Sequence, residues 1–421
     1  MVSEVLYLNL VSIVSRQQAL FFIDKKSQQY IINIDKIVGE GKMGNKMDLK
    51  LGIIGGGQLG KMMAQEARKF GFKVFVLDPT PGSPASQVAD SQIVADFYNT
   101  DKIKELVEKS DISTYEIEHI NTDVLKELVY KGYTVHPSPE VLETIKDKSR
   151  QKQMLNQNHI PTSRWKMVEK DLYSEVIDFG LPAVQKACRG GYDGRGVFVI
   201  HEKQDVLNAL KCDSFLEELV DIEKELAVMV ARSAKGEIKC YPVVEMAFDE
   251  RANICDTVIA PARVNQRIQQ EASDIAVSCV EALDGVGIFG IEMFLTRAGK
   301  VLVNEIAPRP HNSGHYTIEA CATSQFEQHI RAIAGFPLGS TELLVPAVMV
   351  NILGEEGYEG RPNFAGIEDV LAIPGASIHI YGKKTTKPFR KMGHVTIVDK
   401  NMDTALEKAE IVKHKLKVKS Y

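Results

Sequence analysis

Leu51-Gly-Ile-Ile-Gly-Gly-Gly-Gln-Leu-Gly60 is the stretch of sequence that decides the fold of the first part of the chain. Its apolar start predicts a strand, and the apolar residues after its G-x-G-x-x-G turn recur at helical spacing until Gly71. Lys73 to Leu77 predicts the next strand. A strand, a glycine turn, a helix and another strand open a parallel α/β unit, so we predict a Rossmann-like sheet here.

The turn from Gly55 to Gly60 is a candidate anion site. Asp78 stands at the end of the following strand, 78 − 55 = 23 residues after Gly55, which completes a dinucleotide-binding pattern. In that pattern the glycines let the helix N-terminus approach a phosphate, and the carboxylate binds ribose hydroxyls. The same glycines serve any phosphate or a tight turn alone, so a phosphate, a nicotinamide dinucleotide and turn geometry stay open as alternatives.

The composition is that of an ordinary globular protein of about three domains, at roughly 150 residues each. Lys+Arg 51 and Asp+Glu 56 give a net charge of −5 without single-sign blocks, so we expect no nucleic-acid partner. The six cysteines form no C-x-x-C pair, which indicates neither a disulfide framework nor a cysteine zinc site. No stretch reaches the roughly 18 apolar residues of a membrane span. Val5 to Val14 lacks the basic flank of a signal peptide, so we expect a cytoplasmic protein.

Changes of pattern along the chain predict its domains. The middle part mixes hairpins, glycine-rich loops and helices such as Gln269 to Leu283, whereas the tail has short β-like runs and a helix from Asp403 to Lys415. The predicted segments are 1–46, an extension outside the folded body; 47–147, the Rossmann-like domain; 148–346, an α+β domain; and 347–421, a small β-rich domain.

Lys186-Ala-Cys-Arg-Gly-Gly-Tyr-Asp-Gly-Arg-Gly196 is a second glycine-rich stretch, between two β-like runs. Four glycines in seven residues expose backbone N–H groups, while Lys186, Arg189 and Arg195 supply positive charge for a polyphosphate. We predict a lid over a triphosphate. A floppy hairpin tip is the alternative, but it leaves Tyr192 and Asp193 between the glycines unexplained.

The stretch from Gly290 to Glu305 predicts a hairpin with two facing acids. If Ala298-Gly299 is a two-residue loop, Glu292 lies opposite Glu305, roughly 5 Å away on one face. Such a pair is destabilising unless a proton or cation lies between the carboxylates, and Mg²⁺ with substrate phosphates is the usual solution. Ala is a poor first loop residue, and a slip of one residue would separate the acids, so solvated surface acids stay an alternative.

Two further clusters are candidates for ligand binding. Arg309, His311, Asn312 and His315 follow the second strand of this hairpin, where loops commonly build sites. Histidines four apart suggest zinc, but Pro310 just before them and Gly314 between them argue against a helix, so we expect substrate contact. The second cluster, a phosphate site or a solvated loop, consists of Lys383, Lys384, Lys387, Arg390 and Lys391.

Taken together, these motifs resemble the 5-(carboxyamino)imidazole ribonucleotide synthase family of ATP-grasp ligases, in unbroken order from about Leu51 to Val398. Residues 1–46 have no counterpart in the family. The resemblance implies an ATP-grasp fold and a homodimer. It also implies an ATP- and Mg²⁺-dependent carboxylation of 5-aminoimidazole ribonucleotide by bicarbonate in purine biosynthesis, through carboxyphosphate, giving ADP and phosphate. The motifs that carry it are Gly55 to Gly60, Gly190 to Gly196, Asn304 to His315 and Arg390 to His394.

The resemblance also implies roles for individual residues. Contacts to ATP are implied for Lys148, Lys186, Gly190, Gly191, Gly194, Gly196, Glu217, Glu218, Leu219, Val220, Glu225, Asn304 and Glu305. Contacts to the ribonucleotide are implied for Gly57, Gln58, Leu59, Arg309, His311, Asn312, Arg390 and Lys391. Catalytic roles are implied for Tyr192, Asp193, Arg195 and Lys383, the last in proton handling, and Mg²⁺ binding for Glu292 and Glu305. Lys148 stands where Arg is common and Glu218 where Lys or Gln is common, which affects ATP affinity more than the reaction type.

Other functions remain to be separated from this one. A glycinamide ribonucleotide transformylase or a biotin carboxylase would share the ATP-grasp features but take another acceptor. A nicotinamide dehydrogenase or a nucleotide-sensing module would use the first glycine turn and Asp78. Neither of these last two accounts for the Glu292 and Glu305 pair or for the Tyr192 loop.

Overall fold

The computed structural model describes residues 20–23, 29–32, 48–190, 196–249 and 254–421. The chain divides into two units, Met1–Lys46 and Met47–Tyr421. In the first unit, β1 (Leu20–Ile23) pairs antiparallel with β2 (Gln29–Ile32). All candidate site residues belong to the second unit.

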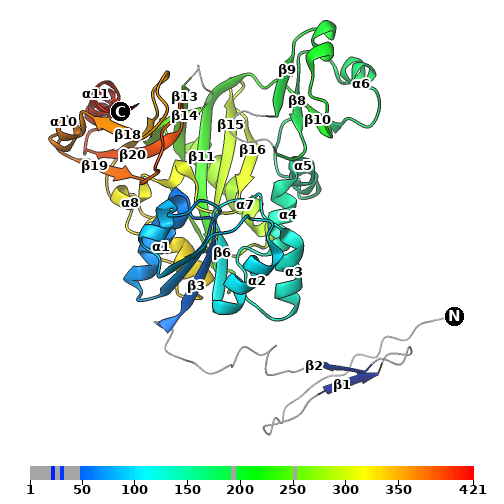
Figure 1. Cartoon of the computed structure of the whole chain (residues 1–421). Coiled ribbons are helices and arrows are strands. Elements are labelled where there is room, and N and C mark those ends of the chain that lie inside the picture. Colours follow the sequence, from blue (N-terminus) through cyan, green and yellow to red (C-terminus); the bar gives the residue numbers. More distant parts are fainter. Residues whose placement is uncertain (1–19, 24–28, 33–47, 191–195, 250–253) are drawn as a thin grey trace. The chain divides into compact units, whose positions relative to one another are not determined.

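The second unit opens with the predicted parallel sheet, drawn in blue to cyan in Figure 1, in the order β5-β4-β3-β6. Side chains alternate between its faces, so that Ile53 packs towards α1 while Ile54 packs towards α2 and α3. Gly71 ends α1 in the left-handed conformation, as predicted. The elements are β3 (Lys50–Ile54), α1 (Gln58–Lys69), β4 (Lys73–Leu77), β5 (Ser91–Ile93), α2 (Thr100–Lys109), β6 (Ile112–Tyr115) and α3 (Thr122–Tyr130).

A small antiparallel sheet carries the second glycine-rich stretch. Its order is β7-β10-β8-β9, and the stretch connects β8 to β9, as the sequence predicts. Two helices, α4 (Pro139–Lys146) and α5 (Lys148–Gln157), join it to the first sheet. The elements of the small sheet are β7 (Trp165–Met167), α6 (Leu172–Phe179), β8 (Ala183–Ala187), β9 (Val197–Ile200) and β10 (Ser214–Glu218).

In the described part of the chain, nine strands form one large sheet in the order β16-β15-β11-β13-β14-β17-β20-β19, with β12 beside β11. β14 pairs with β17, so the predicted α+β and β-rich segments share this sheet instead of having separate ones. The strands are β11 (Ile222–Arg232), β12 (Ile238–Cys240), β13 (Val244–Asp249), β14 (Ile254–Ala260), β15 (Gly287–Thr296), β16 (Val301–Ala307), β17 (Ala347–Leu353), β19 (Ala376–Ile380) and β20 (Lys391–Val398).

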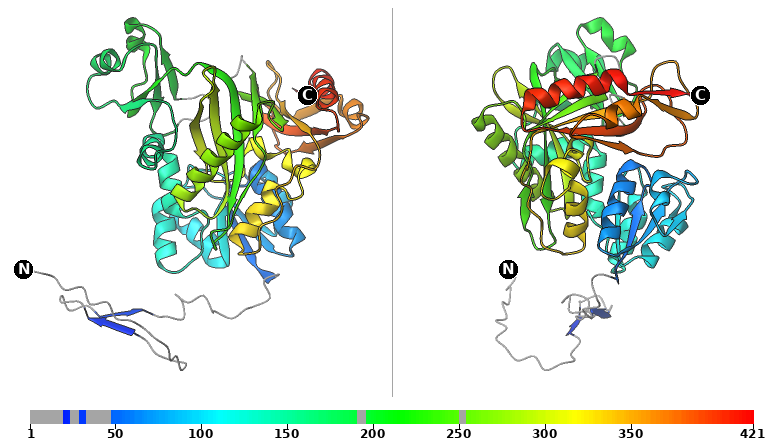
Figure 2. Two further views of the ribbon diagram at one scale, coloured as in Figure 1. Left: turned by 180° about the vertical axis from the view of Figure 1, so that it is seen from behind. Right: turned by 90° about the vertical axis from the view of Figure 1, so that its left-hand side faces the viewer.

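The long helix α7 (Gln266–Leu283) covers one face of β11, β15 and β16, as the rear view in Figure 2 shows. Ile291 and Met293 of β15 pack against Cys279 of α7 in the largest apolar cluster among the described residues. Because side chains alternate along a strand, Glu292 points to the opposite face. The core under α7 therefore fixes which face of the sheet carries the acids.

The remaining elements surround the large sheet. The predicted C-terminal helix is present as α11, whereas the pair β18–β21 and the short α10 were not predicted from the sequence. No helix in the described ranges is both long and apolar enough to cross a bilayer. These elements are α8 (Thr317–Ala320), α9 (Gln325–Ile333), β18 (Pro362–Ala365), α10 (Ile367–Leu371), α11 (Met402–Lys415) and β21 (Lys417–Ser420).

We predict that a chain beginning at Met47 keeps the thermal stability and activity of the full chain. The reason is that β3, which starts at Lys50, pairs with β4 and β6 of its own unit. Thermal melts of the two chains, followed by circular dichroism, measure this. A melting temperature lower by several degrees, on the order of 1 kcal/mol or more, would show instead that residues 1–46 stabilise the second unit.

Candidate active site

Glu292 and Glu305 pair directly across the β15–β16 hairpin, as predicted, but by a different turn. The expected two-residue loop Ala298-Gly299 is wrong, because the pairing next to the turn leaves the three residues Arg297-Ala298-Gly299. Gly299 has the positive φ of 74° that such a loop needs. The extra residue Asn304 then forms a bulge, which brings Glu305 back opposite Glu292.

A third acid, Glu225 of β11, lies on the same face of the sheet as the pair. Burial, followed by the nearby Glu305 and Glu225 carboxylates, raises the pKa of Glu292 to about 8. Burial also raises the pKa of Glu225 to about 7, against the pull of Lys186. Three half-buried acids on one face resist ionising together, so this face favours a bound cation.

Lys148 supplies part of the positive charge that these acids require. Its Nζ lies 2.5 Å from Oε2 of Glu305, and it is the first residue of α5. Burial alone would lower the pKa of Lys148, but the Glu305 carboxylate outweighs burial and raises it. Lys148 therefore stays charged, consistent with its implied contact to ATP phosphates.

A buried ion-pair network holds the second implied ATP lysine, Lys186. Its Nζ lies 2.5 Å from Oε2 of Glu217 and donates to Oδ1 of Asn304 at 3.1 Å. The other oxygen of Glu217 pairs with Lys152, which the sequence reading missed because nothing in its neighbourhood marks it. Burial would raise the pKa of Glu217, but Lys186 and Lys152 outweigh it and lower this pKa to about 2.

The implied adenine segment follows directly after this network. Because the Glu217 carboxylate is occupied by two lysines, its contact with adenine would come from the backbone. The Glu218 carboxylate accepts a hydrogen bond from the Arg164 backbone N–H at 2.9 Å. Leu219 is exposed and Val220 is half-buried, so they lie where a ligand can reach them.

The loop after β16 places Arg309, His311 and Asn312 beside the acids. Arg309 pairs with Glu118 at 2.9 Å, and His311 Nε2 lies 3.2 Å from Oε1 of Glu292. Nε of Arg309 and Nδ2 of Asn312 are buried and have no hydrogen-bond partner in the described part of the chain. Buried donors normally have partners, so these two favour a ligand with acceptor atoms.

The basic cluster lies on the connection between β19 and β20. Lys383 Nζ donates to the Lys391 carbonyl at 2.7 Å, and Arg390 Nη1 donates twice to Thr385 at 2.8 Å. Lys391 lies near the acids, since its charge opposes the rise in the pKa of Glu292 and adds to the lowering of the His311 pKa, which burial mainly causes. The structure therefore brings this cluster, the loop after β16 and the acid pair into one region.

The first glycine turn has a different partner from the one expected. The backbone N–H groups of Gly57 and Gly60 donate to the carboxylate of Glu116, which follows β6, and Gly56 donates to Asp78 at 2.8 Å. In the structure these donors already bind carboxylates, so a phosphate at this turn and ribose binding by Asp78 stay predictions. Glu116 is the anion that the sequence reading missed, although it ends the strand next to β3.

The other predicted residues near this turn are placed as follows. The side chain of Leu59 is part of the apolar core, so only its backbone is open to a ligand, whereas Gln58 is half-buried at the start of α1. In the second glycine stretch, Gly190 and Gly196 have positive φ. The remaining residues of that stretch, Gly191, Tyr192, Asp193, Gly194 and Arg195, lie outside the described residues.

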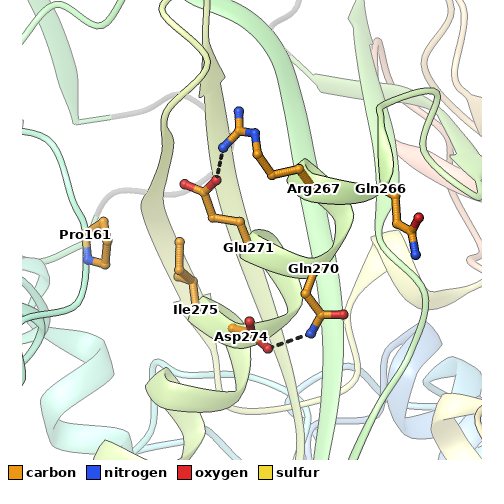
Figure 3. A pocket seen from close by; sticks show the side chains of 7 residues that line it. All are labelled: Pro161, Gln266, Arg267, Gln270, Glu271, Asp274 and Ile275. Carbon is orange, nitrogen blue, oxygen red and sulfur yellow. Dashed lines mark hydrogen bonds and ion pairs between the residues drawn. The ribbon is translucent and has the colours of Figure 1, made fainter.

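A surface pocket lies beside α7, away from the acid pair (Figure 3). Its polar side chains pair along the helix, Arg267 with Glu271 at 2.6 Å and Gln270 with Asp274 at 2.8 Å. Since α7 covers the face of the sheet opposite to Glu292, this pocket is separate from the candidate site.

Comparisons with known proteins agree with this geometry. Three family descriptions match in order: a ribonucleotide synthetase preATP-grasp domain over residues 47–146, an ATP-grasp domain over 153–326, and a phosphoribosylaminoimidazole carboxylase C-terminal domain over 347–408. The N5-carboxyaminoimidazole ribonucleotide synthase of Bacillus subtilis is 45% identical over 359 residues, which are 84% of this chain and 92% of that protein.

Solved structures give the same result. The N5-carboxyaminoimidazole ribonucleotide synthetase of Thermotoga maritima is 61% identical, with a TM-score of 0.84 over 89% of this chain and 100% of that one. The enzyme of Aspergillus clavatus, in complex with ADP and 5-aminoimidazole ribonucleotide, is 35% identical, with a TM-score of 0.80 over 88% and 98%. With this identity and coverage, the chain belongs to the N5-carboxyaminoimidazole ribonucleotide synthase family of ATP-grasp proteins.

Proposed function

We propose that the protein carboxylates the amine of 5-aminoimidazole ribonucleotide with bicarbonate, at the cost of ATP, in purine biosynthesis. The observation that carries this proposal is the Glu292 and Glu305 pair, with Lys148 on one side and Lys391 nearby. The Aspergillus clavatus relative, whose structure contains ADP and 5-aminoimidazole ribonucleotide, supports the choice of substrate.

In this proposal ATP lies between the small sheet and the acid pair. Lys148 and Lys186 neutralise its phosphates, the backbone of Glu217 to Val220 contacts the adenine, and Glu225 binds the ribose. Both lysines are already held by carboxylates, so they are fixed in position before ATP arrives. Phosphoryl transfer depends on such positioning and charge neutralisation.

The acid pair fits Mg²⁺. Two facing carboxylates and the amide of Asn304 offer hard oxygen ligands, and Mg²⁺ in nucleotide sites takes one or two carboxylates together with phosphates and water. No cluster of three His, Cys, Asp or Glu side chains suited to a metal occurs in the described ranges, so phosphates would complete the shell. Bound Mg²⁺ would offset the repulsion between Glu292 and Glu305 and stabilise charge on the phosphates.

The ribonucleotide would bind between the loop after β16 and the β19–β20 connection. Arg390 and Lys391 hold its phosphate, while the unpartnered donors of Arg309 and Asn312 meet its acceptor atoms. Lys383, which lies against the Lys391 carbonyl, is proposed to handle a proton. Gly57 and Gln58 border this region, because Lys61 on the same helix reaches the carbonyls of residues 380 and 381.

The proposed reaction has two steps. A bicarbonate oxygen bonds to the γ-phosphorus of ATP while the bond between this phosphorus and the oxygen that leaves with ADP breaks. The product of this step is carboxyphosphate. The C–O bond of carboxyphosphate then breaks, the amine nitrogen bonds to the released carbon dioxide and loses a proton, and phosphate leaves. Tyr192, Asp193 and Arg195 are proposed to close over this intermediate and keep water away from it.

Three further features belong to the proposal. The acceptor is 5-aminoimidazole ribonucleotide rather than glycinamide ribonucleotide or biotin, which an ADP-release assay with each acceptor tests. The protein acts as a homodimer, which light scattering on a sizing column tests. It works in the cytoplasm, which cell fractionation tests.

We predict that Glu305→Gln lowers kcat at saturating Mg²⁺ to less than a tenth of the wild-type value. The change keeps the shape of the side chain but removes one of the two charges on the metal face. Coupled ADP-release kinetics measure it, with a thermal melt to show that the protein is folded. Glu271→Gln on α7, the helix that covers the opposite face of the sheet, is the matched control and should leave kcat unchanged. A folded Glu305→Gln protein with more than a tenth of the activity contradicts the metal role.

We predict that Arg390→Ala raises the KM for the ribonucleotide roughly 10- to 150-fold and leaves the KM for ATP nearly unchanged. A charge-assisted hydrogen bond is worth about 1.5–3 kcal/mol, and each 1.36 kcal/mol is tenfold. Lys400→Ala, in the exposed turn after β20, is the control. NAD should not bind in a fluorescence titration. A rise confined to ATP, or saturable NAD binding, would mean that the basic cluster has been assigned to the wrong ligand.

A further inference from the structure

Gln325, at the start of α9, holds the loop after β16 by its side chain. Its Oε1 accepts from the backbone N–H of His311 at 2.9 Å, and its Nε2 donates to the carbonyl of the same residue at 2.8 Å. Gln325 is completely buried. A Cβ on Gly314 would lie 2.5 Å from Gln325 Oε1, so a glycine is needed for this approach. One buried amide thus fixes both backbone groups of a residue inside the candidate site.

The same amide also contacts His315, which connects the loop to the β-rich segment. Gln325 Nε2 lies 3.1 Å from Nδ1 of His315, and the His315 ring packs on His394 with centroids 4.6 Å apart. His394 in turn stacks on His379 at 4.4 Å and contacts the Tyr381 hydroxyl at 3.0 Å. His394 belongs to β20, the strand that begins with Lys391. The three rings therefore join the loop after β16 to the strand that begins with Lys391 of the basic cluster.

The side chain of His311, whose backbone Gln325 holds, contacts the acid pair. His311 Nδ1 accepts from the Ser313 backbone, which leaves the proton on Nε2, 3.2 Å from Oε1 of Glu292. A Cβ on Gly290 would lie 2.6 Å from the His311 Cβ, so the imidazole is packed against β15 itself. A continuous path of contacts runs from β20 through the buried His315 and Gln325 to the half-buried His311 and Glu292.

We propose that Gln325 and His315 are positioning residues for the carboxylation: they hold the His311 imidazole on Glu292 and keep the loop of Arg309 and Asn312 in register with strand β20. This rests on the proposed function. Neither residue touches the reacting atoms in this scheme. They act by setting the distance between the half of the site that takes the nucleotide phosphates and the half that takes the ribonucleotide.

The chemistry of the path suits such a role. Burial, with small contributions from Lys391 and His379, lowers the pKa of His315 to about 3, so its Nδ1 remains an acceptor for the Gln325 amide at neutral pH. Burial also lowers the pKa of His394, so neither His315 nor His394 carries a buried charge, and the Gln325 amide donates through Nε2 and accepts through Oε1. Displacement of a catalytic geometry by about 1 Å can cost on the order of 100-fold in rate, so a rigid hold has a measurable consequence.

The chain contains a matched control for the test. Gln328 lies one turn further along α9, is equally buried, and also holds the backbone of a single residue: its Nε2 donates to the Gly339 carbonyl at 2.9 Å, and its Oε1 accepts from the Gly339 N–H at 2.7 Å. Gly339 lies outside the candidate site. Gln325→Met and Gln328→Met therefore remove the same pair of backbone hydrogen bonds from the same helix, but only Gln325→Met also removes the contact with His315 and disturbs the site.

We expect Gln325→Met to lower kcat about 10- to 100-fold and to raise the KM for the ribonucleotide about 3- to 10-fold, as for the loss of an outer contact to a metal-site residue. The affinity for ADP with Mg²⁺, measured by calorimetry without the ribonucleotide, should fall about 3- to 10-fold. Gln328→Met should change each value less than twofold, with a similar loss of melting temperature. Equal changes in the two variants, or an unchanged kcat in Gln325→Met, would overturn the proposal.

His315→Phe keeps a ring against His394 but removes the Nδ1 acceptor, and it decides the question if Gln325→Met does not fold. We expect its kcat to fall about 3- to 10-fold while its melting temperature stays within a few degrees of wild type; an unchanged kcat overturns the proposal. The calorimetric measurement of ADP affinity is made without 5-aminoimidazole ribonucleotide, so it does not depend on which substrate is carboxylated. If the wild-type protein released no ADP with 5-aminoimidazole ribonucleotide, the proposed function would fail, while the difference in ADP affinity would still test the positioning role.

Discussion

Repulsion between the Glu292 and Glu305 carboxylates is the constraint on which the rest of the site depends. Backbone pairing across the hairpin fixes them opposite each other, so they cannot move apart without breaking the sheet. Lys148 compensates one oxygen of Glu305, and His311 meets one oxygen of Glu292. Among the described residues, β15 and β16 carry no Lys or Arg, so these two strands supply no charge to compensate the remaining oxygens. In the proposed function, a divalent cation carried in with nucleotide phosphates would satisfy them.

The lysines near this pair are held in advance. Lys186 and Lys152 both bind Glu217, and their charge keeps this buried carboxyl ionised at any working pH, since its pKa is lowered to about 2. A buried carboxylate between two ammonium groups balances charge that would otherwise be costly to bury. The Lys186 ammonium group is therefore already in place when a polyphosphate binds. Preorganised charges of this kind lower a reaction barrier because they need no rearrangement.

Local periodicity was enough to predict most of the fold. The first parallel sheet, helix α7 and the two strands around the glycine-rich stretch depend on patterns within about 20 residues, and these were confirmed. The predicted pairing of Glu292 with Glu305 was confirmed, but the predicted loop was not. The loop is one residue longer than expected, which shifts the register by one residue, and the bulge at Asn304 shifts it back. A bulge has no strong sequence signal, so the cancellation could not be foreseen. The shared sheet through β14 and β17 joins residues about 90 apart and left no local trace.

The glycines show most clearly where sequence reasoning stops. A Cβ on Gly57 would lie 2.6 Å from Oε1 of Glu116, and one on Gly314 would lie 2.5 Å from Gln325. In both places the glycine correctly indicates that something approaches the backbone closely, but spacing alone does not reveal whether that partner is a ligand or a side chain of the same chain. Strand order decides it: β6 lies beside β3, and an acid at the end of β6 is the nearest anion to the turn. A glycine motif in a parallel sheet is therefore best interpreted together with the acids that end the neighbouring strands, because an internal carboxylate at the helix N-terminus competes with any phosphate for the same donors.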